Sequence, residues 1–194
     1  MGKRLIPTWQ PDWLAREGLT PEPQPWEDAW RTASQPNTFE WWYFDAQLDD
    51  GSTAVIVYYT RPITKRRGPL LPAVNLTINK PDGSKLFRYK SYTPADFSAS
   101  TTACEVRIGP NAVRGDLQQY ELRAELDDLA ARLVLTNEVR AWRPNIGKTY
   151  YDDALTSYFA WLVGVPYGRV IGSLTYGGPV SALYRHEVCG GRRG

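Results

Sequence analysis

Four consecutive aromatic residues, Trp41 to Phe44, constrain the fold of this chain more than any other feature. Each can bury roughly 150–250 Å², so the run would be costly to leave in water. In a strand, successive side chains point to opposite faces. One face then carries an acid followed only by apolar residues: Glu40, Trp42, Phe44, Ala46 and Leu48. The other grades from aromatic to polar: Trp41, Tyr43, Asp45 and Gln47. The segment is predicted to be either an ordinary core strand or one wall of an apolar ligand pocket.

The same period of two continues along the chain. Asp49-Asp50-Gly51 is a strong hairpin signal after the aromatic strand. Further strands are expected over residues 52–60, 73–78, 85–91, 105–108, 113–116, 120–127, 131–136, 158–163, 169–176 and 180–188. Short strands at this spacing, with no convincing helix among them, predict an all-β antiparallel barrel or sandwich.

Two segments do not follow this pattern. Residues 1–38 are rich in proline, which prevents a long helix. They are expected to form an irregular arm that packs its tryptophans on the body, with a helical turn only near residues 28–32.

The segment 138–156 is too long for a hairpin loop and is predicted to be a functional rim. Within it, Arg143 is expected to pair with Asp152 or Asp153.

Composition excludes several classes of function. The net charge of +2 gives no basic field for nucleic acid. Cys104 and Cys189 make neither a disulfide framework nor a zinc site, and Cys104 is expected to be a buried thiol. The single histidine, His186, has no triad motif around it. No cofactor is expected. No signal peptide or transmembrane segment is visible, so the chain is expected to be cytoplasmic, with peripheral membrane association left open.

Glu40 and Asp45 are the candidate catalytic residues. Loss of hydration raises the pKa of a carboxyl group, and a protonated carboxyl group in an apolar pocket can protonate an alkene. Neighbouring aromatic rings would stabilise the resulting cation. The alternative is that Glu40 only accepts hydrogen bonds that close the start of the strand. The predicted ligand-binding residues are all aromatic: Trp41, Trp42, Tyr43, Phe44, Trp142, Tyr158, Phe159 and Trp161.

Several blocks of the chain resemble a known family. Glu40-Trp41-Trp42-Tyr43-Phe44-Asp45, followed by Asp49-Asp50-Gly51, is similar to the opening motif of the AttH-like, hydroxyneurosporene synthase-like family of carotenoid 1,2-hydratase. Later blocks also resemble it: Cys104 to Gly109, Gly115-Asp116-Leu117, Ala141 to Pro144, and Tyr158 to Gly168. The resemblance spans roughly residues 38–178, and the first and last blocks together are fairly specific.

The resemblance implies a lipocalin-like barrel or strongly curved sheet over residues 39–188, between the arm (1–38) and a tail (189–194). Such domains usually occur in pairs, with an apolar site near their junction. The resemblance implies that this sequence corresponds to one half of a two-domain architecture, so a second lipocalin-like domain or a homodimer is the expected partner. The implied ligand is an apolar polyene or isoprenoid-type molecule. Two functions stay open: a hydro-lyase or cyclase, active only in a longer protein, and a non-catalytic carrier.

Overall fold

The computed structural model describes residues 5–33, 35, 37–65, 67–176 and, for the backbone alone, 181–193. Three short helices are present in this part of the chain: α1 (Asp12–Glu17), η1 (Pro25–Asp28) and η2 (Pro94–Asp96). The strands are β1 (Trp41–Gln47), β2 (Thr53–Tyr59), β3 (Ala73–Asn79), β4 (Lys85–Ser91), β5 (Phe97–Ala99), β6 (Cys104–Ile108), β7 (Asn111–Gly115), β8 (Gln119–Leu126), β9 (Leu129–Asn137), β10 (Lys148–Tyr150), β11 (Tyr158–Tyr176) and β12 (Ser181–Arg193). The prediction of an all-β chain is confirmed.

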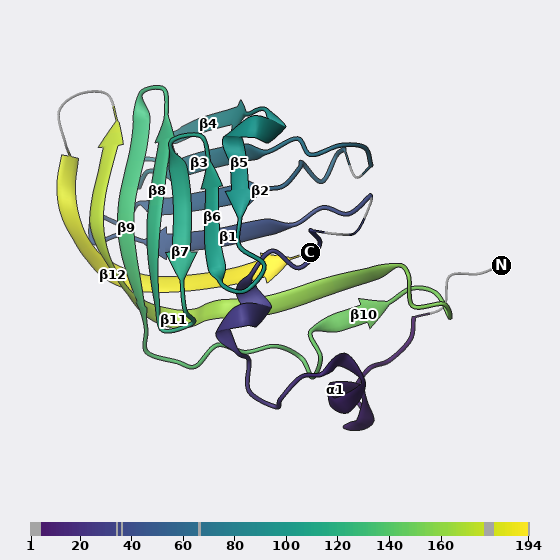
Figure 1. Ribbon diagram of the computed structural model, residues 1–194. Coiled ribbons are helices and arrows are strands. Elements are labelled where there is room, and N and C mark those ends of the chain that lie inside the picture. The colour runs from purple at the N-terminus through teal and green to yellow at the C-terminus, as the bar shows by residue number, and fades with distance from the viewer. Residues whose placement is uncertain (1–4, 34, 36, 66, 177–180, 194) are drawn as a thin grey trace.

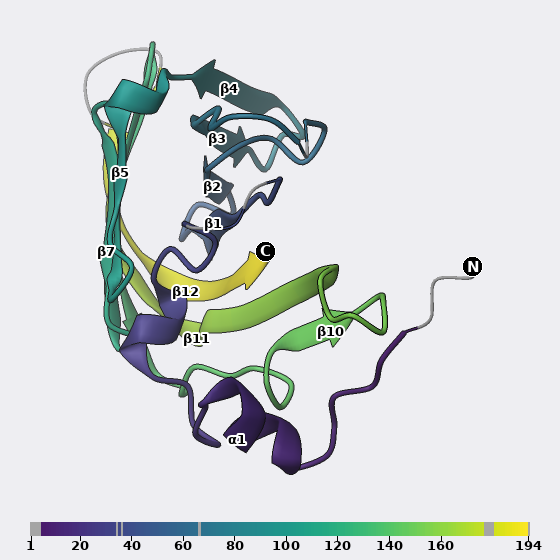
Figure 2. The same cartoon turned by 45° about the vertical axis from the view of Figure 1, so that its right-hand side comes forward.

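All strands belong to one antiparallel sheet in the order β4-β3-β2-β1-β12-β11-β9-β8-β7-β6-β5, and β10 pairs with β11 at its side. Among the described residues no ladder joins β4 to β5, so the sheet is strongly curved and does not close into a barrel. Figures 1 and 2 show β1–β4 and β5–β9 as two layers that face one another, and the long strands β11 and β12 extend the second layer beside β9 before they curve beneath both. Of the two predicted forms, the curved sheet is the one observed.

The predicted alternation along the aromatic strand is confirmed. The side chains of Trp42 and Phe44 are buried and belong to the hydrophobic core between the two layers. The ring of Phe44 lies 5.3 Å from that of Tyr120 on β8, in the facing layer. The indole N–H of Trp42 donates a 3.0 Å hydrogen bond to the carbonyl oxygen of Asp28. Because a buried indole needs such an acceptor, the core strand and the arm are tied together at this point.

Residues 158–176 form a single strand, although two separate strands were expected there. The ladder to β12 continues across the intervening residues with register shifts at Val165, next to Pro166. Bulges of this kind let a strand bend without ending. Gly168 permits the close approach to β9, because a Cβ atom there would lie 2.2 Å from the carbonyl oxygen of Thr136. The bent strand therefore joins the body to the region beside β10 (Figure 1).

β12 extends to Arg193, beyond the predicted end at residue 188. The expected Gly177-Gly178 turn and the side chain of His186 lie outside the described residues. No helix in the described part of the chain is long and apolar enough to cross a membrane.

The arm folds differently from the prediction, which placed its only helical turn at residues 28–32. α1 occupies the proline-free stretch after Pro11, and η1 begins with Pro25 as its first residue. Proline is well tolerated in a first helical turn because its fixed φ suits the helix and no N–H is needed there. Figure 2 shows α1 packed below β10, on the side away from β1–β4.

The end of η1 inserts a carboxylate into the core. The Tyr120 hydroxyl donates a 2.7 Å hydrogen bond to Asp28 Oδ2, and both residues are buried. Burial, and then the neighbouring charge of Asp28, raise the pKa of the Cys104 thiol well above its ordinary value. Cys104 is thus the inert buried thiol that the sequence predicted.

Candidate functional site

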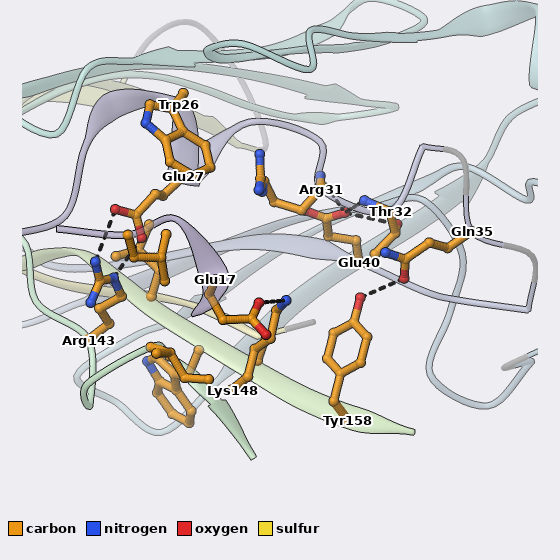
Figure 3. A pocket seen from close by; sticks show the side chains of 16 residues that line it. Glu17, Trp26, Glu27, Arg31, Thr32, Gln35, Glu40, Arg143, Lys148 and Tyr158 are labelled. Atoms are coloured by element: carbon orange, nitrogen blue, oxygen red, sulfur yellow. Dashed lines mark hydrogen bonds and ion pairs between the residues drawn. The ribbon is translucent and has the colours of Figure 1, made fainter. Parts of the chain in front are cut away.

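A cavity of about 140 Å³ lies between the arm and strands β10 and β11 (Figure 3). We call it the arm cavity. The arm and the start of β1 contribute one part of its lining: Glu17, Leu19, Trp26, Glu27, Arg31, Thr32, Gln35 and Glu40. The rim segment and β11 contribute the other: Arg143, Ile146, Gly147, Lys148, Tyr158, Ala160, Trp161 and Leu162. The cavity therefore combines an apolar wall with three carboxylates and three cations.

A buried ion pair closes one side of the arm cavity. Arg143 Nε donates to Glu27 Oε2 at 2.6 Å, and Nη2 donates to Glu27 Oε1 at 3.2 Å. Arg143 also donates to the carbonyl oxygens of Thr20, at 2.6 Å, and of Asn145. A two-point guanidinium–carboxylate pair with its other N–H groups bonded is the arrangement in which buried charges are tolerated. The predicted pairing of Arg143 with Asp152 or Asp153 is wrong.

Asp152 instead bonds within its own loop. Its carboxylate accepts hydrogen bonds from the backbone N–H groups of Thr156 and Ser157, at 2.8 and 2.7 Å, and from the Thr156 hydroxyl. These bonds hold residues 152–157 in a local loop.

A tight turn places Arg143 and Lys148 on the same cavity. The Gly147 N–H donates to the carbonyl oxygen of Pro144 at 2.8 Å, and Gly147 has a φ of +70°. A Cβ atom at this position would lie 2.9 Å from the carbonyl oxygen of Trp161. Glycine satisfies both conditions, the left-handed φ and the close contact.

Glu17 on α1 forms a second polar cluster with β10. Lys148 Nζ lies 2.6 Å from Glu17 Oε2, and the Tyr150 hydroxyl donates to Glu17 Oε1 at 2.7 Å. Burial raises the pKa of Glu17, but the bonds from Lys148 and Tyr150 and the charges of Lys148 and Arg16 outweigh it and hold the pKa below its ordinary value. This carboxylate is a fixed anion and not a proton donor.

Glu40 lines the arm cavity but is held by a full set of hydrogen bonds. Its Oε2 accepts from the Arg31 and Thr32 backbone N–H groups, both at 3.1 Å, and from the Thr32 hydroxyl at 2.9 Å. Its own N–H donates to the Thr60 hydroxyl at 2.8 Å. The side chain is buried. These contacts match the alternative in which Glu40 closes the start of the strand.

Asp45 does not line the arm cavity. It lies on the face of β1 opposite the core, and its buried Oδ1 has no hydrogen-bond partner among the described residues. Burial raises the pKa of Asp45 above its ordinary value. This shift of the pKa is in the direction expected of a proton donor, but Asp45 is not part of the cavity lining.

Two of the predicted aromatic residues line the arm cavity. The Tyr158 hydroxyl donates to Gln35 Oε1 at 2.6 Å, and Lys148 Nζ lies 5.2 Å from the centre of the Tyr158 ring. Burial raises the pKa of Tyr158 above its ordinary value, although the bond to Gln35 and the charge of Arg31 oppose this. Trp161 forms part of the apolar wall.

The other predicted ligand-binding residues lie outside the cavity lining. Trp42 and Phe44 are core residues. Trp41 is buried on the opposite face, stacked 5.4 Å from Phe39. Trp142 is 57% exposed. The last two are partly exposed: Tyr43 and Phe159. Their part in binding stays a prediction.

The polar half of the cavity is not predicted by any pattern in the sequence. Glu17, Trp26, Arg31 and Lys148 belong to no recognised motif, although the arm alternates charged and tryptophan residues around its prolines. Among residues whose side chains are described, no group of three His, Cys, Asp or Glu residues could hold a metal ion.

No family model and no curated protein sequence matches this chain. Its fold is shared with solved structures. One is a provisionally named AttH protein from Nitrosomonas europaea, with a TM-score of 0.62 and 15% identity, over 80% of this chain and 51% of that one. Another is kievitone hydratase from Nectria haematococca, with a TM-score of 0.57 and 13% identity, over 90% of this chain and 56% of that one. The chain spans about half the length of each. The predicted AttH-like resemblance is thus confirmed at the level of the fold.

Proposed function

We propose that the arm cavity binds an apolar small molecule of the polyene or isoprenoid type. The observation that supports this most is the composition of the lining, in which Trp161, Leu162 and Ile146 form an apolar wall opposite fixed polar groups. Small-molecule sites are usually lined in this way.

The size of the cavity limits what it can hold. An engineered apolar cavity of about 150 Å³ accepts a benzene molecule, and the arm cavity has a volume of about 140 Å³. It would therefore enclose one ring or one branched end group, while the remainder of a longer ligand extends to the surface. Arg31 and Gln35 are exposed lining residues, so the opening lies on their side.

Acid-assisted hydration or cyclisation is the second candidate. It is favoured by the fold shared with a protein named kievitone hydratase and by Tyr158, whose raised pKa keeps its hydroxyl protonated at the cavity wall. Addition of water to an alkene needs a proton donor for one carbon and a water molecule for the other. Glu40, fixed by its three donors, is better suited to positioning than to proton transfer, and this favours the carrier function for the described chain.

Isothermal titration of the purified chain with geraniol, a neutral isoprenoid, tests the proposal. We expect saturable binding that Trp161→Ala weakens and Trp9→Ala does not, because Trp9 is an exposed arm tryptophan outside the lining. Circular dichroism must show that both variants are folded. Wild-type affinity in folded Trp161→Ala would refute the site. Mass spectrometry of the ligand after incubation separates the two functions, since only an enzyme adds water to it.

We also propose that a second lipocalin-like domain or a second copy of the chain is the partner. Support comes from the edge strand β4, where Phe87 and Tyr89 are 50% and 43% exposed. Exposed aromatic residues on a sheet edge favour association. Sedimentation velocity should show concentration-dependent dimerisation that Phe87→Ser reduces.

A further inference from the structure

We propose that the ligand of the arm cavity carries a carboxylate, which Arg31 binds at the mouth of the cavity. This inference rests on the proposed function and narrows its ligand to amphipathic acids. The juxtaposition that carries it is an exposed guanidinium with no carboxylate partner among the described residues, beside a cavity that has an apolar wall and room for about one ring.

The three cations of the lining are not equivalent. Arg143 lies 2.6 Å from a carboxylate oxygen of Glu27, and Lys148 lies 2.6 Å from one of Glu17. No described carboxylate lies within ion-pair distance of the Arg31 guanidinium. The third lining carboxylate, Glu40, accepts hydrogen bonds from the Arg31 backbone N–H and not from its side chain. Arg31 is therefore the lining cation that a ligand can use.

Arg31 is also held in a suitable orientation. Its guanidinium carbon lies 4.4 Å from the centre of the Trp26 ring, and Figure 3 shows its side chain directed toward Trp26 and away from Glu40. Stacking on an aromatic face leaves the N–H edge of a guanidinium available for a planar, two-point partner. The charge of Arg31 also lowers the pKa of Tyr158, against the effect of burial, which places the guanidinium within electrostatic reach of the cavity wall.

A carboxylate fits this site better than a phosphate. A single guanidinium fork matches one carboxylate in a two-point bond. A phosphate carries more negative charge, and it would face the carboxylates of Glu17 and Glu27, whose cations are already engaged. The inferred ligand thus has a carboxylate at the mouth and an apolar end group against Trp161 and Leu162.

Calorimetric titration with geranic acid, geraniol and geranyl phosphate tests this inference, because the three differ only in the polar end. We expect geranic acid to bind at least ~10-fold more tightly than geraniol, as charge-assisted hydrogen bonds contribute that much. Arg31→Gln should remove the preference, so that geranic acid binds to this variant no more tightly than geraniol does. Arg31→Lys should retain only part of it, because an ammonium group lacks the planar fork.

Arg16→Gln is the matched control. The Arg16 guanidinium lies 4.8 Å from the Trp13 ring, also on the arm, but neither residue lines the cavity. This variant should keep the full preference for geranic acid. Three results would overturn the inference: equal binding of geranic acid and geraniol, a preference that survives Arg31→Gln, or a preference for geranyl phosphate. Binding of geraniol in the same experiment would still support the proposed function. If no probe binds to the folded protein, the proposed function fails and the inference fails with it.

Discussion

The core between the two layers and the junction between arm and body are built from different interactions. The core is formed mainly by apolar side chains such as Trp42, Leu76 and Leu135, each at most 1% exposed. The junction depends on charged groups, and Glu27 and Arg143 there are also buried, at 9% and 5% exposure. Apolar packing stabilises without exact partners, whereas buried charges stabilise only when every partner is present. The junction therefore determines the shape of the cavity, but it tolerates the loss of a partner less well than the core does.

The largest expected effect tests the core. Trp42→Ala removes a fully buried side chain and its hydrogen bond to Asp28, and it should lower the free energy of unfolding by ~3–5 kcal/mol. Trp161→Ala removes a tryptophan of the junction. Because this side chain is only partly buried, the decrease in the free energy of unfolding should be clearly smaller. Urea denaturation followed by circular dichroism compares them. Equal decreases in the free energy of unfolding would mean that the core and the junction depend equally on apolar packing.

The next effect tests the junction. Arg143→Met leaves the Glu27 carboxylate buried without its cation, which should cost about 3 kcal/mol. Hydrogen exchange should rise across the arm first, because Arg143 also bonds to the Thr20 carbonyl oxygen. Adding Glu27→Gln to this variant removes the uncompensated charge and should recover much of the loss. No recovery in the double variant would show that the pair matters through packing alone.

A smaller effect is expected at Glu40. Glu40→Gln replaces one of the carboxylate oxygens that accept from Arg31 and Thr32 with an amide group that donates, and should cost ~1–2 kcal/mol. Glu121→Gln, at an exposed pair with Arg114, should change stability by far less. Thermal unfolding of both variants provides the comparison. A Glu40→Gln protein of unchanged stability would return Glu40 to consideration as a proton donor.

The smallest effect is a dependence on pH. The pKa of Glu17 is lowered in the folded protein, so the stability it contributes is present above its unfolded pKa and is lost as the pH falls through the folded value. Glu17→Gln should remove this acid-side loss, which amounts to less than about 1 kcal/mol because the group is partly exposed.

Asp45→Asn should remove a pH dependence of stability that has the opposite sign. The raised pKa of Asp45 makes stability fall as the pH rises from its unfolded value through its folded value. Denaturant midpoints measured across acidic pH separate the two signs.

The contrast between core and junction also explains what could be predicted from the sequence. Alternation along β1 and β8 identifies core residues because each strand carries its own period of two, as Trp42, Phe44 and Leu122 illustrate. The arm cavity depends on contacts between distant segments, such as Thr20 with Arg143. Local patterns hold no information about such pairs. The prediction for Arg143 failed for this reason, since it considered acids of the same segment, Asp152 and Asp153, whereas the partner, Glu27, lies on the arm.

The central claim is that the arm cavity, and not the core or the exposed aromatic faces, binds the ligand. Ala160→Leu adds a side chain directly to the cavity lining. Ala130→Leu adds the same side chain to a partly exposed position on β9 outside it. Calorimetric titration of both variants with geraniol tests the claim most directly. The account predicts that Ala160→Leu loses at least ~10-fold in affinity with its fold intact, while Ala130→Leu binds like wild type. Undiminished binding by folded Ala160→Leu would contradict it.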